Sequence, residues 1–578
     1  MALDMPNQAT PAPVNRSTGP ISLGQFGVWL VALVMGVPIA VVLSRLTIPA
    51  DDIWSHLTDT VLGLYVSNSL LLVLGTTVGS LIVGVGCAWL VASCAFPGRR
   101  WMRWLLLAPA ALPAYVVAYA YTDLFQFAGP IQTTLRDVFG WRHGDYWFPE
   151  IRSMGGAILV MTAVFFPYVY IFTLVAFAAQ GDRIMAIARS LGRGPWGAFW
   201  FAALPLARPA IIGGLALVIM ETLADFGAVQ HFSIPTFTTG IYRTWFAMGA
   251  PLPAAKLAAL LLLAIGLVLM IEAALRGRGH SSGSNSQSVS GMPTLFHLKG
   301  WRALFAFTAC AVPVLIGFIG PVLTLIALAI RPEGLQALPL MLSAISDTLL
   351  LGVLAGLVTV TIALYLARSV GLRGSGGDQL GLLPRAGVRL ATLGYAVPGL
   401  VLAVGMLAPF GAIDRLLNAI AENWFGVSVG LVFSGTIFTL IYAYCVRFLT
   451  VAVKGIEPGL GRLPPSMLQA SQSLGVTGWR RMLRVELPIL RPSLLAALVF
   501  VIVEVVKELP ATLVLRPFQI ETLALLAYRY ASDERLVAAA LPSLVIALIG
   551  LIPVMILGYV MFGSGQKAAE PATKNSPV

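Results

Sequence analysis

Long apolar runs recur along the whole chain, each close to the length that a membrane-spanning helix needs. The first extends from about Gln25 to Leu46, and a ~30 Å hydrocarbon core requires about 20 mostly apolar residues of helix. Only helices and closed barrels satisfy their backbone hydrogen bonds in lipid. The composition agrees, because only 11% of the residues are charged against about 25% in a soluble domain. We therefore expect an all-α polytopic membrane protein.

The apolar runs fall into two groups of six, which predicts about twelve transmembrane helices. The expected spans are roughly 25–46, 68–95, 104–126, 155–179, 209–229 and 256–275, then 304–330, 346–369, 388–410, 428–452, 490–506 and 537–562. The segment HSSGSNSQSVSG at 280–291 has the composition of a flexible linker. The expected organisation is a disordered cytoplasmic tail (1–24), a first six-helix repeat (25–275), a cytoplasmic linker (276–303), a second repeat (304–562) and a cytoplasmic tail (563–578).

The charges in the loops predict an orientation. If the N-terminus is cytoplasmic, the loops on that side hold 22 Lys and Arg against 5 Asp and Glu. Cytoplasmic loops carry such an excess of basic residues, so both termini are expected in the cytoplasm. The net charge of +12 is dispersed over these loops without a basic domain, which argues against nucleic acid and favours the lipid bilayer as the partner.

One loop occurs twice. SLGRGPWGAFWFAALPLARP at 190–209 aligns with SLGVTGWRRMLRVELPILRP at 473–492 at a constant offset of 283. The first copy contributes Ser190, Leu191, Gly192, Trp196, Leu204, Pro205 and Pro209, and the second copy contributes Ser473, Leu474, Gly475, Trp479, Leu487, Pro488 and Pro492. We interpret the chain as a tandem duplication of a six-helix unit with parallel topology.

The composition of the repeated loop predicts a helix that a partner can approach. Its central Gly allows a sharp turn or close contact, and a Pro early in the following helix costs little. We expect a short helix along the cytoplasmic face in each half, offered to a partner outside the membrane. The alternative is a plain linker between helices, but a linker has no need to repeat Gly, Trp and Pro in register.

These residues carry a family resemblance. SLGxxxWxxFxxxxLPxxxP resembles the EAA loop of ABC importer permeases, and two copies in one chain resemble the fused permeases of MetI-like fold. The resemblance implies that each loop is a coupling helix seated in a cleft of an ATPase subunit. The Glu usual in this loop is replaced by Ala186 in the first copy and by Gln469 in the second, which puts Glu-mediated pairing with the ATPase in doubt.

Four further segments resemble the ferric-iron importer permeases in particular. They are LPAYVVAYAYTDLFQFAGPIQT (112–133), YWFPEIRSMGG (146–156), ETLADFGAVQHFSIPTFTTGIYRTWF (221–246) and KELPATLVLRPFQIETLALLAYRYASDERL (507–536). The resemblance implies a bacterial inner-membrane subunit that passes ferric iron, with a homodimeric ATPase and a periplasmic binding protein as partners. Permeases for thiamine, phosphonate, sulfate or polyamine share this architecture and remain alternatives.

Catalytic and cofactor motifs are not found. The sequence has no GxxxxGK[ST], so this chain cannot hydrolyse ATP by that route, and the energy must come from another subunit or from an ion gradient. The family resemblance implies a transport subunit that is not an enzyme, with ATP hydrolysed by the partner subunit. The five histidines lack paired spacing, and His231 is interpreted as a loop hydrogen-bonder. No metal site and no bound cofactor are expected. Aromatic residues such as Tyr115 are expected in an interfacial belt.

Two acidic pairs form the candidate translocation path: Glu221 with Asp225, and Glu504 with Glu508. Their i,i+4 spacing predicts one helix face for each pair, beyond the midpoint of the membrane. Carboxylates there are costly unless they face a partner or water, and oxygen ligands suit a hard cation. The alternative is that Lys507, Arg243 or Arg516 neutralises the acids in structural ion pairs. A secondary transporter driven by an ion gradient is the runner-up from another class.

Overall fold

The computed structural model describes residues 23–49, 51–142, 144–190, 194–276, 296–371 and 382–562. Before residue 277 its helices are α1 (Leu23–Ser44), α2 (Asp52–Thr60), α3 (Leu62–Ser93), α4 (Arg99–Leu105), α5 (Ala114–Phe125), α6 (Pro130–Phe139), α7 (Met154–Ser190), α8 (Pro195–Ala198), α9 (Leu204–Ala224), α10 (Gly227–His231), α11 (Phe237–Tyr242) and α12 (Pro251–Arg276).

After residue 295 the helices are α13 (Trp301–Val314), α14 (Gly320–Ala329), α15 (Pro332–Leu335), α16 (Leu338–Gly371), α17 (Leu382–Ala391), α18 (Gly399–Phe425), α19 (Ile437–Leu460), α20 (Pro465–Ser473), α21 (Gly478–Arg481), α22 (Leu487–Lys507), α23 (Pro510–Leu515), α24 (Leu523–Ser532) and α25 (Leu536–Phe562). Short 3₁₀ turns are η1 (Arg45–Thr47), η2 (Ala108–Ala111) and η7 (Leu393–Ala396). Turns of π-helix are η3 (Phe199–Ala203), η4 (Arg243–Ala247), η5 (Leu315–Ile319) and η8 (Met482–Glu486). Two short strands, β1 (Cys94–Ala95) and β2 (Phe296–His297), pair in parallel.

The all-α polytopic fold predicted from the apolar runs is confirmed. Eleven helices within the described residues are long and apolar enough to cross a membrane, and a twelfth candidate is a bent pair. That pair, Arg99–Ala111 with Ala114–Phe139, turns by 93°. The straight span expected at 104–126 is therefore wrong. Pro109 and Pro113 explain the break, because proline removes a backbone donor and disfavours helix in the residue before it.

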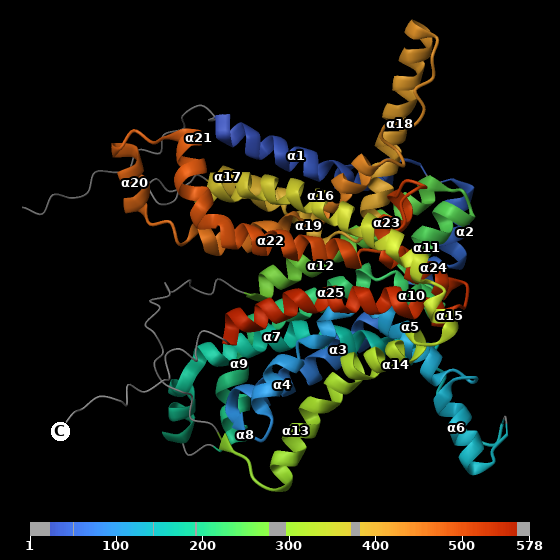
Figure 1. The fold of residues 1–578 in the computed structure, drawn as a ribbon, viewed down its shortest axis with the longest axis vertical. Coiled ribbons are helices and arrows are strands. Elements are labelled where there is room, and N and C mark those ends of the chain that lie inside the picture. The colour runs from blue at the N-terminus through green and yellow to red at the C-terminus, as the bar shows by residue number, and fades with distance from the viewer. Residues whose placement is uncertain are drawn as a thin grey trace, which may run out of the picture.

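The helices run side by side between two ends of a bundle (Figure 1). One end carries α8 and α21, which lie within the two repeated loops, and α20, which ends at the first residue of the second loop; we call it the motif end. The opposite end carries α2, α10, α15 and α24, and we call it the far end.

The two halves of the chain are interlocked. Within each half a long helix is packed between two others, α7 between α3 and α9, and α19 between α16 and α22. The first span of each half also packs against the other half: α1 against α17 and α18, and α13 and α14 against α3, α4 and α5. Both hydrophobic clusters of the core accordingly contain residues from the two halves. The division into domains at residues 276 and 303 stays a prediction.

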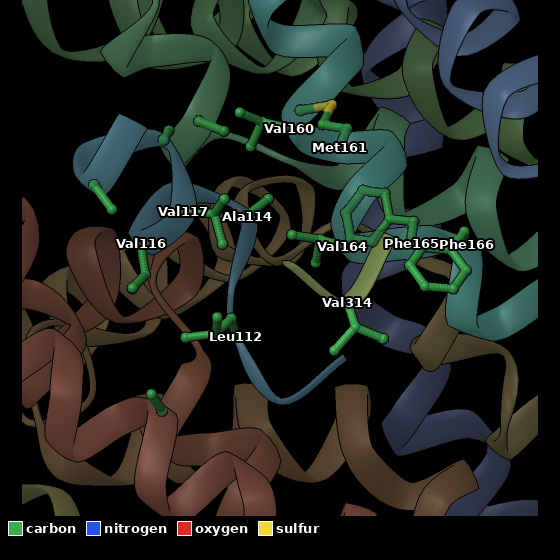
Figure 2. Close-up of a cluster of buried hydrophobic side chains, with 14 of the residues drawn as sticks. Leu112, Ala114, Val116, Val117, Val160, Met161, Val164, Phe165, Phe166 and Val314 are labelled. Atoms are coloured by element: carbon green, nitrogen blue, oxygen red, sulfur yellow. The ribbon is translucent and has the colours of Figure 1, made fainter. Parts of the chain in front are cut away.

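Close packing surrounds the break before α5. Figure 2 shows Leu112, Ala114 and neighbouring residues of this turn beside Val164 and other side chains of α7, with Val314 of the second half next to them. All of these side chains are buried. The break is thus fixed from both halves of the chain, and it places the start of α5 next to the ends of α9 and α22.

Candidate functional site

A cavity of about 120 Å³ lies where α5, α7, α9, α19 and α22 meet. All four predicted acids line it: Glu221, Asp225, Glu504 and Glu508. The first two come from the end of α9 and the others from the end of α22. The fold therefore brings together two acidic pairs that are 283 residues apart in sequence.

The second acid of each pair lies outside its helix, which corrects the expectation of one helix face per pair. α9 ends at Ala224 and α22 ends at Lys507, so Asp225 and Glu508 are extended capping residues. Asp225 Oδ1 accepts hydrogen bonds from the N–H groups of Ala228 (3.0 Å) and Val229 (3.2 Å).

Glu508 repeats this arrangement in the second half. Its Oε1 accepts from the N–H of Ala511 at 3.1 Å, and its backbone carbonyl accepts from the Thr512 hydroxyl at 2.8 Å. Each of these two carboxylates thus helps to begin the next short helix, α10 or α23. This role is structural, because the first N–H groups of a helix have no partner within it. Glu221 and Glu504 remain inside their helices and are only partly buried.

Two basic side chains also line the cavity. Arg447 Nε lies 3.0 Å from Glu508 Oε2, and both side chains are largely buried. Lys507 Nζ lies 3.9 Å from Glu504 Oε1 and donates to the carbonyl of Ala110 at 3.4 Å. The structural alternative is therefore correct for Lys507, although that contact is long.

The other two predicted partners of the acids are wrong, since neither Arg243 nor Arg516 lines the cavity. Arg516 instead donates to the carbonyl of Ile520 at 2.8 Å. Sequence reasoning missed Arg447, although a single Arg within the apolar run of α19 was a usable signal.

Tyrosines complete the wall of the cavity. Tyr115, Tyr168 and Tyr395 line it. Tyr115 is buried and its hydroxyl has no hydrogen-bond partner among the described residues, so its assignment to an interfacial belt is wrong. Within the same residues, no group of three or more His, Cys, Asp or Glu side chains is placed to hold a metal ion. The lining thus combines four acidic and two basic side chains with three tyrosines.

The second copy of the repeated loop forms a separate helix at the motif end. Residues 461–464 separate α19 from α20. Pro464 and Pro465 explain this break, because proline disfavours the interior of a helix but is tolerated in its first turn. α20 ends at Ser473, and Gly475 follows with a φ of +72°, a conformation that favours glycine. A Cβ added to Gly475 would have no atom within 4 Å.

The first copy differs in part from the expected short helix. Ser190 is the last residue of α7, which continues from Met154 although it contains Pro167. The first half has Gly181 and Asp182 where the second half has Pro464 and Pro465, so no pair of prolines separates a helix like α20 from it. Leu191 and Gly192 lie outside the described residues. From there on the two copies have the same elements at the same offset of 283: α8 and α21, η3 and η8, α9 and α22. The repeated Trp196 and Trp479 are 72% and 66% exposed.

The remaining motif residues lie at corresponding places. Ser473 and Leu474 are exposed at the end of α20, next to Gly475. Leu204 and Pro205 in the first copy, and Leu487 and Pro488 in the second, form the first turn of α9 and α22. Pro209 and Pro492 lie inside these helices and are exposed.

The two copies are attached to the bundle by different chemistry. In the first half, Phe199 of η3 packs against Trp89 of α3 and Phe177 of α7. The ring centroids of Trp89 and Phe199 are 5.0 Å apart, and those of Trp89 and Phe177 are 5.6 Å apart. This aromatic anchor is buried in the larger part of the core.

In the second half the corresponding anchor is ionic. Glu486 of η8 is only 1% exposed and is held between Arg368 of α16 and Arg481 of α21. Arg368 Nε donates to Glu486 Oε2 at 2.6 Å, and Arg481 Nε donates to Oε1 at 2.8 Å. Ala203 and Ala198 occupy the positions of Glu486 and Arg481 at the offset of 283, so the first half lacks these charges. We call this group the Glu486 anchor.

At the far end an ion pair joins the first half of the chain to the second half. Arg152 lies before α7 and Glu534 after α24, and their side chains form two hydrogen bonds of 2.8 and 2.6 Å. The hydrogen bonds from Arg152 hold the pKa of Glu534 below its usual value. His231 lies nearby and contacts the Thr122 hydroxyl at 2.9 Å. Burial and the positive charge of Arg152 lower the pKa of His231 to about 4, so this imidazole is neutral at pH 7.

Comparison with known proteins supports a transport role for the whole arrangement. The chain is 28% identical to the Fe(3+)-transport system permease protein FbpB 2 of Haemophilus influenzae over 498 residues, which is 85% of this chain and 88% of that protein. It is 32% identical to the molybdenum transport system permease protein ModB of Escherichia coli over 171 residues, or 29% of this chain and 72% of ModB.

A third relative is the molybdate/tungstate transport system permease protein WtpB of Thermococcus kodakarensis, which is 26% identical over 203 residues, or 35% of this chain and 73% of that protein. Residues 379–564 match the family described as binding-protein-dependent transport system inner membrane component. This match covers α17 to α25 and includes the second repeated loop, Glu486 with Arg481, and the two acids that α22 brings to the cavity. The chain therefore belongs to this family, as a fused permease subunit of the ABC importers.

Proposed function

We propose that this permease passes ferric iron, received from a periplasmic binding protein, through the acidic cavity at the ends of α9 and α22. The observation that carries the proposal is the convergence of four carboxylates on one cavity, supported by the resemblance to an Fe(3+)-transport permease over most of the chain. Carboxylate oxygens are the ligands that a hard, highly charged cation prefers. In this proposal the chain moves its cargo without performing chemistry on it.

The cavity suits transit better than tight binding. Asp225 and Glu508 are already engaged by backbone N–H groups, and Arg447 pairs with Glu508. Glu504 has a long contact with Lys507, and Glu221 shares a hydrogen bond with the Tyr395 side chain. The Tyr115 hydroxyl on the wall of the same cavity has no partner among the described residues. A passing cation would meet two carboxylates and a phenol without a closed cage, which lowers the barrier but leaves the ion free to move on.

The repeated loops would receive the energy for transport. In this proposal a homodimeric ATPase binds the motif end, one subunit at each copy, and its closure is transmitted through α9 and α22 to the cavity. The exposed Trp196 and Trp479 and the open surface at Gly475 support such contacts. The motif end is then cytoplasmic, together with both termini, and the far end is periplasmic.

A substitution that removes charge but keeps shape tests the path. The complete complex of permease, ATPase and iron-loaded binding protein is reconstituted, and ⁵⁵Fe uptake is compared for wild type and the double variant Glu221→Gln, Glu504→Gln. We expect uptake to fall at least tenfold while ATPase binding is unchanged. A matched control is Glu457→Gln, which lies at the exposed motif end of α19. Wild-type uptake by the double variant, or failure of the variant to assemble, would refute the path assignment.

Molybdate is the second candidate cargo, because the names of two relatives described above refer to molybdenum transport and to molybdate/tungstate transport. The cavity argues against an oxyanion, since four carboxylates face two basic side chains there. Stimulation of the ATPase by a molybdate-loaded binding protein, and none by an iron-loaded one, would decide for this alternative. Proton- or sodium-driven uptake by the chain alone would instead favour a secondary transporter.

A further inference from the structure

One part of the permease extends sideways out of the bundle. The first residues of α18, Gly399–Met406, are all buried, whereas those from 411 to 425 are mostly exposed. Pro409 lies at the change between the two parts. Figure 1 shows this outer part leaving the far end of the bundle, across the direction of the other long helices. We call residues 411–436, which include the segment that returns to α19, the α18 arm.

Hydrogen bonds give the arm a defined structure. The carboxylate of Asp414 accepts from the N–H groups of Val432, Phe433 and Ser434 at 3.1, 2.8 and 2.7 Å. The Asn418 side chain accepts from the N–H of Gly430 at 2.9 Å and donates to its carbonyl at 2.7 Å. The return segment is therefore held along the helix by hydrogen bonds within the arm itself.

The outer helix of the arm is amphipathic. Its apolar side chains follow each other at spacings of three or four residues, which places them on one helix face. They are Ile413, Leu416, Ile420 and Trp424, all of them exposed. Arg415 and Glu422 lie on the opposite face at 100° per residue. At the tip, Trp424 is 80% exposed. In water such a stripe would be an unfavourable apolar patch.

The apolar stripe continues into the surface of a membrane-spanning helix. Ile413 lines an apolar groove together with Val34 and Val37, which are exposed side chains of the span α1. A phospholipid that covers this side of α1 would therefore also meet the beginning of the stripe. This continuity identifies lipid as the partner of the arm.

A second helix at the same end has a similar character. α6 extends from the bundle in the opposite direction to the α18 arm (Figure 1). Val138 and Phe139 are exposed on it, and the ring of Phe139 stacks on that of Trp141 at 4.6 Å. Aromatic side chains of this kind prefer the boundary between headgroups and acyl chains. Each half of the chain thus contributes one lateral amphipathic helix at the far end.

From these observations we infer that the α18 arm lies flat in the phospholipid interface at the far end, with its apolar stripe toward the acyl chains and Arg415 and Glu422 toward water. Amphipathic helices bury their apolar face about 5–10 Å into the boundary between headgroups and acyl chains. The arm would then fix the depth and the tilt of the far end relative to the membrane surface. This inference rests on membership of the membrane family and needs neither the cargo nor the orientation proposed above.

Site-directed spin labels test the arm in a bilayer. The four buried cysteines are replaced, and single labels are placed at Leu416, Ile420 or Trp424 on the stripe and at Arg415 or Glu422 on the opposite face. The full-length protein is reconstituted in phosphatidylethanolamine and phosphatidylglycerol nanodiscs, without ATPase or binding protein. Collision rates with oxygen and with a water-soluble nickel chelate are measured for each label.

We expect the ratio of oxygen to nickel collisions to be at least threefold higher at the three stripe positions than at the two control positions. Equal ratios around the helix would show that the arm stands in water and would overturn the inference. Protection of the stripe only after the binding protein is added would also overturn it, since the partner would then be a protein. Neither result would bear on iron uptake.

Discussion

Replacement of Glu486 by Gln should loosen the second repeated loop without affecting the first. Glu486 is buried between Arg368 and Arg481, and the Gln side chain cannot neutralise either of them. Removing one member of a buried ion pair costs about 3–5 kcal/mol. Because the Arg368 side chain is 30% exposed, water recovers part of this, and we expect about 3 kcal/mol. That corresponds to a factor of roughly 100 in the equilibrium between attached and detached loop.

The assay is the number of ATP molecules hydrolysed for each ion imported by the reconstituted complex. A detached second loop should still bind the ATPase but transmit its closure poorly, so this ratio should rise several-fold while the ATPase rate changes little. The matched control is Glu457→Gln, which removes the exposed pair with Lys454 at the same end of the bundle. Such surface pairs contribute only about 0–1 kcal/mol, and the control should couple normally.

A second variant separates a loss of anchoring from a general defect in folding. The changes Arg481→Ala, Met482→Phe and Glu486→Ala introduce the residues that the first half has at the offset of 283, and Arg368→Trp adds an aromatic side chain on α16. We expect this variant to couple better than Glu486→Gln, although it contains no charge at these positions. A normal coupling ratio for Glu486→Gln, at normal abundance in the membrane, would refute the reasoning.

Three further predictions follow from the loops and the far end. Gly475→Glu should uncouple ATP hydrolysis from uptake, because the larger side chain meets the ATPase. Gly475→Ala requires the same strained φ of +72° but adds little bulk, so its effect should be milder. Wild-type uptake by both variants would contradict the docking of the ATPase at this loop. Burial lowers the pKa of His231 in the folded protein to about 4. The neutral imidazole therefore contributes fully to the free energy of unfolding above pH 6.5, and this contribution of ~3 kcal/mol is lost as the pH falls toward 4. His231→Gln should flatten this pH dependence of the melting temperature, and an unchanged slope would exclude His231 as its source. Topology reporters at Asn285 and at the C-terminus should report cytoplasm and reporters in the 136–150 loop should report periplasm; a periplasmic signal at Asn285 would break the six-plus-six scheme.

The sequence was a good guide to the membrane helices and a poorer one to their ends. Apolar runs mark the spans because lipid accepts little else, but they do not show where the backbone turns within a run. The third span breaks near Pro113, and Asp225 and Glu508 leave their helices one residue earlier than an i,i+4 pair requires. Pro510 and Gly227 are local signals for these ends, since proline and glycine disfavour continued helix.

The composition of the cavity depends on contacts between distant segments. The repeat at offset 283 predicts that the acids of the two halves are equivalent, yet it does not indicate which basic side chains approach them. Arg447 reaches Glu508 because α19 packs against α22, and Lys507 reaches the carbonyl of Ala110 because the broken span turns back there. The repeat also does not predict how each loop is attached to the bundle. The first loop is held by aromatic packing and the second by the ion pairs of the Glu486 anchor. Such contacts require the three-dimensional structure.

ATP-driven accumulation of iron in sealed vesicles tests the central claim most directly. Proteoliposomes contain the purified permease with its ATPase, ⁵⁵Fe-loaded binding protein is supplied on the far-end side, and ATP is supplied on the motif-end side. Our account predicts accumulation that requires ATP hydrolysis and persists when ionophores remove all ion gradients. Accumulation by the permease alone, driven by an ion gradient and abolished by ionophores, would contradict it.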